Sequence, residues 1–281
     1  MHFTEAYLLR PTNPVTINVI GAGGNGSLMI TALARMNAAM VALGHPGLQV
    51  QLFDADTVTA ANLARQLFVT EELGLNKSVV LITRINRFFG THWRAHPHMF
   101  GNKLFKESGT SHLSANLTIS CVDTAAARFE IATVLTKCCA QRHRYGQTHQ
   151  PFYWMDLGNA RFTGQVLLST PSPIKQPSSQ MFTPVCTLPL LTKEFAELLQ
   201  TATDTDNGPS CSLAEALEKQ DLFINNAVVN AAASLLWTLF RKGMTAYRGV
   251  FINLENYRTQ PLNVAPATRR KRSSKRKKAV A

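Results

Sequence analysis

The segment 54–66, "DADTVTAANLARQ", brings together side chains that suit phosphate chemistry. Two acids come directly after an apolar run, and two amides and an arginine follow them: Asp54, Asp56, Asn62, Arg65 and Gln66. A dinucleotide site needs one acid for the ribose hydroxyls and no clustered cations beyond it. Cleavage between the α- and β-phosphates of a nucleoside triphosphate gathers negative charge, which arginine, lysine and a metal ion stabilise. The segment therefore favours a nucleoside triphosphate site.

Two further charged residues fit the same chemistry. Lys77, twelve residues after Arg65, stands at a predicted helix start and offers a point charge to phosphate oxygens. Asp123 ends another apolar run and could hold Mg²⁺. Because ligands of open parallel sheets lie beyond the carboxyl ends of the strands, we expect 21–26, 54–66 and Asp123 to meet in one crevice.

A strand, a glycine-rich turn and a helix are expected ahead of this segment. Residues 15–20, "VTINVI", predict a strand, "GAGGNGS" follows, and 28–43 predict a helix rich in Ala, Leu and Met. Glycines allow a tight turn and close backbone approach, and the helix N-terminus offers free N–H groups to a phosphate. The glycines expected to lie against a nucleotide are Gly21, Gly23, Gly24 and Gly26.

Strands and helices alternate through the first 170 residues. "GLQVQLFD", "NLTISCVD", "PFYWMDLG" and "GQVLLST" predict strands, and 77–89 and 124–141 predict helices. This alternation predicts an α/β fold with a Rossmann-like, mostly parallel sheet and helices on both faces. For "HWRAHPH" (92–98) we expect a solvated loop rather than a metal site, because no acidic or cysteine partner stands beside the histidines.

The second part of the chain has a different texture. Residues 171–192 are rich in proline and predict a loop, 212–243 predict one bent helix or two, and 246–264 alternate like a strand hairpin. These C-terminal helices and antiparallel strands complete a predicted folded unit, 1–264. Residues 265–281 are expected to form a disordered basic tail.

Three motifs resemble those of the ThiF/MoeB family, relatives of ubiquitin-activating enzymes: "GAGGNGS", "DADTVTAANLARQ" and "CVDT". The second motif matches the family pattern D-x-D-x-V-x-x-x-N-L-x-R-Q at every fixed position, which makes the signal specific. The resemblance runs loosely from about 15 to 262. Within the family, the chain is most similar to the ThiF-related proteins of the bacterial PRTRC gene cassette.

The resemblance implies ATP and magnesium as cofactors and a role for each motif residue. Asp54 would bind the ATP ribose, and Asp123 would coordinate Mg²⁺. Phosphate contacts would come from three side chains, with a fourth supporting them: Asn62, Arg65, Lys77 and Gln66. Asp56 stays open between a nucleotide contact and a turn or capping residue.

The family reaction that the resemblance implies is adenylation. The C-terminal carboxylate of a small ubiquitin-like (β-grasp) protein attacks the α-phosphate of ATP, which gives an acyl-adenylate and pyrophosphate. Positioning and charge stabilisation do most of this work, so no protein nucleophile is needed. The family also implies a homodimer.

The cysteines mark where the chain departs from the family. The family's zinc-binding C-x-x-C pairs are missing from the sequence, so we expect no zinc. Some relatives transfer the acyl group to a cysteine. Cys211 stands where a helix is expected to begin, which would lower its pKa, and Cys186 in the proline-rich loop is a weaker candidate. Free cysteines are more often buried small hydrophobes.

The net charge of +12 is unevenly distributed, since residues 269–278 hold eight of the 29 Lys and Arg. This tail could contact nucleic acid through phosphate charge, or serve only as a solubilising terminus. The sequence holds no apolar stretch long enough to span a bilayer and no secretory signal, so we expect a cytoplasmic protein without membrane contact.

Two alternatives to the enzyme remain open. One is a non-catalytic nucleotide-binding or DNA-associated scaffold of the same fold, which would use the basic tail. The other is a nicotinamide-dependent oxidoreductase, which the group of polar residues from Asn62 to Gln66 disfavours.

Overall fold

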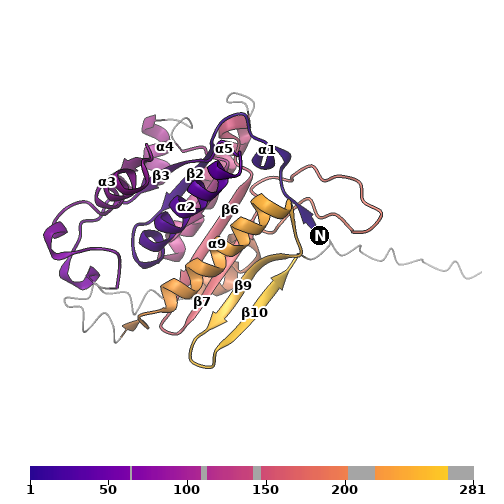
Figure 1. The fold of residues 1–281 in the computed structure, drawn as a ribbon. Helices are drawn as coiled ribbons and strands as arrows, with labels where there is room; N and C mark the ends of the chain where they lie inside the picture. Colours follow the sequence, from indigo (N-terminus) through magenta and orange to yellow (C-terminus); the bar gives the residue numbers. More distant parts are fainter. Residues whose placement is uncertain (64, 109–112, 142–146, 202–218, 265–281) are drawn as a thin grey trace, which may run out of the picture.

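A computed structural model describes residues 1–63, 65–108, 113–141, 147–201 and 219–264. Its main element is an eight-stranded sheet (Figure 1). In spatial order the strands are β10 (Arg258–Asn263), β9 (Tyr247–Asn253), β7 (Thr163–Ser169), β6 (Tyr153–Asn159), β5 (Leu117–Ser120), β2 (Val15–Ile20), β3 (Leu48–Phe53) and β4 (Arg94–His96). From β6 to β4 all neighbours are parallel, whereas β7, β9 and β10 continue the sheet in antiparallel fashion. The predicted fold class is confirmed.

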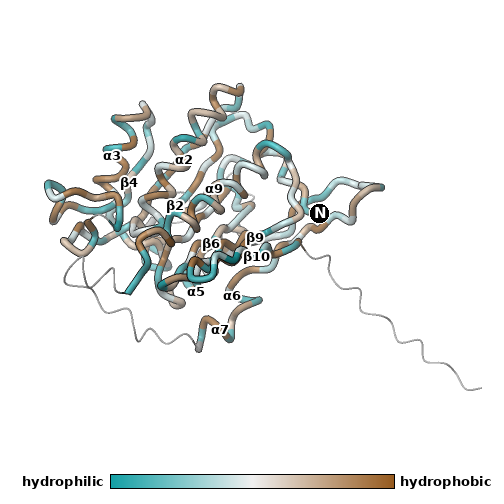
Figure 2. Tube along the Cα trace, turned by 60° about the horizontal axis from the view of Figure 1, so that its bottom comes forward, coloured by the Kyte–Doolittle hydropathy of each residue, from teal (hydrophilic) through white to brown (hydrophobic). Residues whose placement is uncertain are grey.

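Helices cover both faces of the sheet. They are α1 (Ala6–Leu9), α2 (Gly24–Ala42), α3 (Lys77–Phe89), α4 (Asn102–Ser108), α5 (Ala125–Ala140), α6 (Leu191–Glu194), α7 (Ala196–Thr201) and α9 (Ile224–Lys242). One hydrophobic core joins α2, α3 and α9 to the sheet, and a second joins α5 to the opposite face. Figure 2 shows these layers, with α2 and α3 above the strands and α5, α6 and α7 below them.

Three short 3-10 turns and a small second sheet complete the described fold. The turns are Ala60–Asn62, Thr70–Glu72 and Gln147–His149. The second sheet pairs β1 (His2–Phe3) with β8 (Met244–Thr245), so the start of the chain lies beside the end of α9. The described helices include none with the length and apolar composition that a bilayer span requires.

Local sequence signals explain the elements that lead into the site. Every residue of β2, "VTINVI", is buried, as expected for a β-branched central strand with parallel neighbours. Helix α3 begins after Asn76, whose side chain accepts a hydrogen bond from the N–H of Val79, and ends at Gly90 in the left-handed conformation (φ 67°). Such caps satisfy N–H and C=O groups that the helix itself leaves free.

One expected loop is a strand. The solvated loop expected for residues 92–98 is wrong for residues 94–96, because β4 pairs with β3 and forms the edge of the large sheet, whereas residues 97 and 98 are exposed and lie outside the strand. His96 stacks on Phe53 with ring centroids 4.4 Å apart and shares a 2.8 Å hydrogen bond with Gln51. A sequence of polar residues can form an edge strand because only one side of it pairs with the sheet.

The C-terminal prediction is confirmed in part. The expected hairpin is the antiparallel pair β9–β10, and the expected long helix corresponds to α9. Residues 212–218 of that predicted helix lie outside the described residues, as does the basic tail, 265–281. The boundary at residue 264 stays a prediction.

Candidate nucleotide site

The glycine turn after β2 has a backbone that side chains would disrupt. Gly21 has a φ of 92°, and a Cβ atom there would lie 2.8 Å from the carbonyl oxygen of Cys121. A Cβ on Gly26 would lie 1.9 Å from the carbonyl oxygen of Gly21. The turn therefore closes tightly against the start of α2. A Cβ on Gly23 would meet no atom within 4 Å, so the turn is open on that side.

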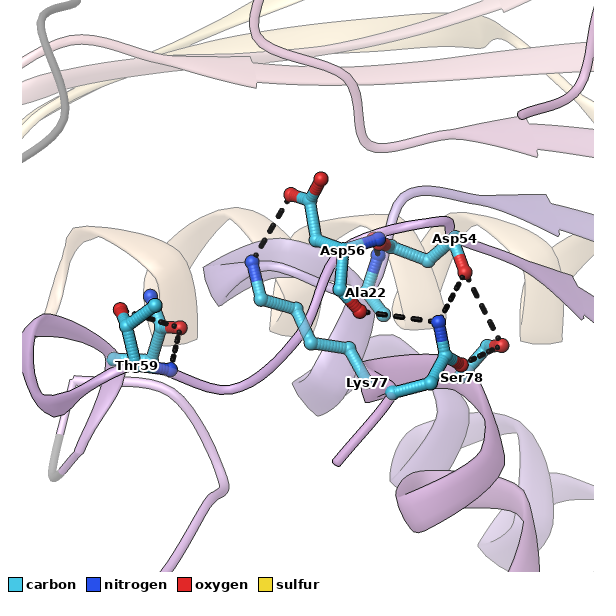
Figure 3. A network of polar contacts seen from close by, with 8 residues as sticks. Ala22, Asp54, Asp56, Thr59, Lys77 and Ser78 are labelled. Carbon is cyan, nitrogen blue, oxygen red and sulfur yellow. Dashed lines mark hydrogen bonds and ion pairs between the residues drawn. The ribbon is translucent and has the colours of Figure 1, made fainter. Parts of the chain in front are cut away.

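Asp54 follows β3 and contacts the glycine turn. One oxygen of its carboxylate accepts a hydrogen bond from the N–H of Ala22 at 2.5 Å, and the other accepts from the N–H of Asp56 at 2.8 Å (Figure 3). Burial raises the pKa of Asp54, although these two N–H donors and the nearby Lys77 act in the opposite direction. The strand-end acid and the turn therefore form one unit, as the sequence predicts.

Lys77, the first residue of α3, reaches across to Asp56 (Figure 3). Its Nζ atom lies 3.2 Å from a carboxylate oxygen of Asp56, and its backbone N–H donates to the Asp56 carbonyl at 2.9 Å. The lysine side chain is only 10 % exposed, whereas that of Asp56 is 68 % exposed. Asp56 thus pairs with Lys77 in this structure, and a direct contact of Asp56 with a nucleotide stays a prediction.

The segment from Asn62 to Gln66 runs beside the start of α2. The side-chain oxygen of Asn62 accepts from both the N–H and the hydroxyl of Thr59, and so caps the short turn 60–62. The N–H of Gln66 donates to the Asn62 carbonyl at 3.0 Å. Just beyond it, the N–H of Leu67 donates to the Ser27 hydroxyl at 3.4 Å. The segment is thereby fixed next to the glycine turn.

Arg65 is a half-buried cation with a neutral partner. One terminal nitrogen of its guanidinium donates to the side-chain oxygen of Gln220, and its Nε atom is buried without a hydrogen-bond partner. No described carboxylate forms an ion pair with it. Burial lowers the pKa of Arg65, because removal from water disfavours the charged form. An anion that reached this position would meet an uncompensated positive charge.

Asp123 lies exposed on the loop between β5 and α5. The buried ion pair of Arg128 and Asp156 fixes this loop. Arg128 donates through Nε to both carboxylate oxygens of Asp156, each at 3.1 Å. Its terminal nitrogens donate to the carbonyls of Val122 at 2.7 Å and Thr124 at 3.1 Å, on either side of Asp123. The guanidinium therefore fixes the backbone that carries the predicted magnesium ligand.

The predictions from sequence miss this ion pair. One signal was available, since Asp156 is an acid within the otherwise apolar strand "YWMDLG", and a buried acid needs a partner. The partner, Arg128, lies on α5, and no local spacing links the two positions. Ser120 also donates its hydroxyl to Asp156, at 2.5 Å.

Three cysteines bear on the prediction of a thioester step. Cys121 follows β5 beside the glycine turn, and burial raises the pKa of its thiol. Cys186 is exposed in the proline-rich loop. Cys211, the candidate for a thioester, lies outside the described residues. The described residues contain no group of three or more His, Cys, Asp or Glu side chains arranged to hold a metal ion.

The site residues thus form two groups at the carboxyl ends of the parallel strands, and direct contacts join the residues within each group. Asp54, Asp56 and Lys77 join the glycine turn to the start of α3. The second group is the segment around Arg65, placed against α2. Asp123 follows strand β5, which neighbours β2, and there the Cys121 N–H donates to the Ile20 carbonyl. No described contact joins the Asp123 side chain to either group.

A family model matches the sequence, and solved structures share the fold. A model of the ThiF family matches residues 10–277. Among solved structures, that of PaaA is 12 % identical, with a TM-score of 0.57 over 91 % of this chain and 65 % of PaaA. That of E. coli MccB with AMPCPP and MccA is 14 % identical, with a TM-score of 0.55 over 93 % of this chain and 66 % of MccB.

The chain therefore spans about two thirds of the length of these structural neighbours, and at such low identity the likeness concerns the fold alone. No protein with a curated description matches the chain significantly. The family model covers the glycine turn, the segment 54–66, Lys77 and Asp123 together. Since this match extends over nearly the whole sequence, the chain belongs to the ThiF family.

Proposed function

We propose that this chain is an ATP-dependent adenylyltransferase that activates the C-terminal carboxylate of a ubiquitin-like protein. The observation that carries the proposal is the placement of Arg65, a half-buried guanidinium without a described carboxylate partner, on a segment that contacts Ser27 near the start of α2. A cation and free N–H groups at a helix N-terminus form a site for phosphate. Solved structures of E. coli MccB with ATP and with AMPCPP support this, because they are of a protein with the same fold.

Each motif residue has a role in this proposal. The ionised carboxylate of Asp54 accepts hydrogen bonds from the ribose hydroxyls, and the glycine turn lies against the phosphates. Arg65 and Lys77 offset the charge that develops on the phosphates. The side-chain amide of Asn62 contacts the phosphates, and Gln66 stabilises the segment that carries Asn62 and Arg65.

The chemical step needs no protein nucleophile. A carboxylate oxygen of the substrate attacks the α-phosphorus of ATP, and the bond from that phosphorus to the oxygen bridging to the β-phosphate breaks. Pyrophosphate leaves with the electron pair, and the acyl-adenylate remains. No proton moves, because the attacking carboxylate is already ionised. Positioning of the two reactants and stabilisation of the pyrophosphate charge therefore supply the catalysis.

The residues present fit a magnesium ion. Asp123 offers an exposed carboxylate that no described cation neutralises. Magnesium in nucleotide sites is commonly held by one or two carboxylates together with substrate phosphates and water. The ion would neutralise part of the triphosphate charge, and Arg128 would keep Asp123 in place by fixing the loop on both sides of it.

The proposal includes a β-grasp protein as the substrate and a homodimer as the assembly. Both rest on the resemblance of the motifs to those of ThiF/MoeB proteins. The MccB structures solved together with MccA show that a protein of this fold has been captured with a second molecule. A substrate with an accessible C-terminal carboxylate is the common requirement of the reaction.

Calorimetric titration with ATP·Mg²⁺ and, separately, with NAD⁺ tests the nucleotide site. We expect wild-type protein to bind ATP·Mg²⁺ and not NAD⁺, and Arg65→Ala to weaken ATP binding. Arg35→Ala is the matched control, because Arg35 is an exposed arginine further along α2. Binding of NAD⁺ without ATP would refute the proposal.

Exchange of labelled pyrophosphate into ATP tests turnover. We expect exchange to depend on an added β-grasp protein and to stop when its C-terminal carboxylate is amidated. Binding of ATP without exchange for any β-grasp protein added would favour the non-catalytic scaffold instead.

A further inference from the structure

A chain of side-chain amides connects Arg65 to the start of α9. The side-chain oxygen of Gln220 accepts from the Arg65 guanidinium, and its Nε2 atom donates to the side-chain oxygen of Asn225 at 3.2 Å. Asn225 is the second residue of α9 and is only 2 % exposed. Both ends of the Gln220 amide are thus engaged, which fixes the orientation that turns its oxygen toward Arg65.

Asn225 also touches the glycine turn. A Cβ atom on Gly24 would lie 2.3 Å from Nδ2 of Asn225, so the amide packs directly on the backbone where α2 begins. The starts of α2 and α9 therefore lie together, and these helices run side by side in Figure 1. Two helix N-termini present the positive ends of their dipoles to the same place.

Buried polar atoms without partners gather around this place. Six such side-chain atoms occur among the described residues, and four of them belong to Asn25, Arg65, Gln66 and Asn225. Two of the four are donors: Nε of Arg65 and Nδ2 of Asn225. A buried donor without an acceptor is costly, and these two donors belong to side chains that Gln220 links, so they indicate that a ligand supplies the acceptor.

Gln220 places a neutral amide, and not a carboxylate, against the Arg65 guanidinium. A carboxylate at this position would bind the guanidinium more strongly than an amide does, since charge-assisted hydrogen bonds are the stronger kind. It would also cancel the positive charge that a phosphate needs. We propose that Gln220 and Asn225 complete the phosphate side of the nucleotide site: Gln220 holds Arg65 without neutralising it, and Asn225 donates a buried N–H beside the glycine turn.

This inference rests on the proposed nucleotide site, and two variants of one residue test it. Gln220→Glu keeps the size and the acceptor but adds a negative charge, whereas Gln220→Met removes the hydrogen bonds without adding charge. We expect Gln220→Glu to lower the affinity for ATP·Mg²⁺ by about tenfold or more and Gln220→Met to lower it less. The ligand-free Gln220→Glu protein should also melt at a higher temperature than wild type, because Arg65 gains a carboxylate partner.

A control at an exposed position and a variant of Asn225 complete the test. Gln260→Glu makes the same charge change on an exposed residue of the edge strand β10 and should leave ATP affinity unchanged. Asn225→Leu removes the donor without adding a charge, and should weaken ATP binding. If wild type binds ATP and Gln220→Glu binds it equally well, or if Gln220→Met loses as much as Gln220→Glu, this inference is overturned and the proposed function stands. Failure of wild type to bind ATP would overturn both.

Discussion

At the residue scale, the Asp54 carboxylate is buried and accepts hydrogen bonds from two backbone N–H groups. Its protonation state should therefore affect both folding stability and ATP binding. Its pKa is raised above the ordinary 3.8, mainly by burial. For an acid with a raised folded pKa, the contribution to folding stability is fully present below pH 3.8 and is lost as the pH rises through the folded pKa. Ribose binding by Asp54, as proposed, would require the opposite state, because the hydroxyls would donate to the ionised carboxylate.

ATP affinity should therefore decrease as the pH falls through the raised pKa of Asp54. This decrease should begin at a higher pH than it would for an exposed aspartate. Titrations of ATP·Mg²⁺ from pH 8 downward, on wild type and Asp54→Asn, check this. The phosphates of ATP titrate equally in both proteins, so the difference between the two curves isolates Asp54. Parallel curves would show that this carboxylate does not bind the ribose.

Asp56 and Lys77 form a pair with unequal exposure, which predicts unequal effects of substitution. The Asp56 carboxylate is 68 % exposed, so Asp56→Asn should change the free energy of unfolding by less than about 1 kcal/mol. Lys77→Met should weaken ATP binding much more than Asp56→Asn does, because the lysine charge is what the phosphates would meet. Urea unfolding and ATP titration of both variants measure the two effects. A larger loss of affinity in Asp56→Asn would assign the nucleotide contact to Asp56.

At the element scale, the loop between β5 and α5 depends on the buried pair of Arg128 and Asp156. The two side chains are 7 % and 1 % exposed, so removal of one leaves the other as an uncompensated buried charge. We expect Asp156→Ala to lower the free energy of unfolding by about 3–5 kcal/mol in urea denaturation. Glu72→Ala is the control, because its partner Arg84 is 40 % exposed, and we expect a loss of about 1 kcal/mol or less. Equal losses of unfolding free energy would show that burial does not set the strength of the pair of Arg128 and Asp156.

The elements also show what sequence can and cannot predict. Strand β2, the glycine turn and helix α3 follow from local signals, since β-branched runs, glycines and caps act within a few residues. The strand β4 was missed because its sequence is polar and its pairing comes from β3. The pair Arg128–Asp156 and the contact of Arg65 with Gln220 were missed because each joins positions far apart in the chain. Family motifs record the residues expected at the ligand, whereas these supporting contacts follow only from packing.

At the scale of the whole molecule, His2 ties the start of the chain to the rest of the fold. It is fully buried, and its ring nitrogens lie 2.6 Å from the Val185 carbonyl oxygen and 2.9 Å from the Tyr153 hydroxyl. The strand that it begins pairs with β8, after α9. One imidazole thus joins the proline-rich loop and β6 to the small second sheet.

Burial lowers the pKa of His2, although the bond to Val185 opposes this shift. The stability that neutral His2 provides is therefore present above the ordinary pKa of 6.5 and is lost as the pH falls through the lowered folded pKa, because the unfolded chain takes up the proton first. We expect the urea-unfolding free energy of wild type to decrease between pH 7.5 and 5 more steeply than that of His2→Gln, which keeps an amide donor for Val185 but cannot titrate. His98→Gln, at an exposed position, should retain the wild-type slope. If His2→Gln also retains it, the pH dependence arises elsewhere and the imidazole does not link these elements energetically.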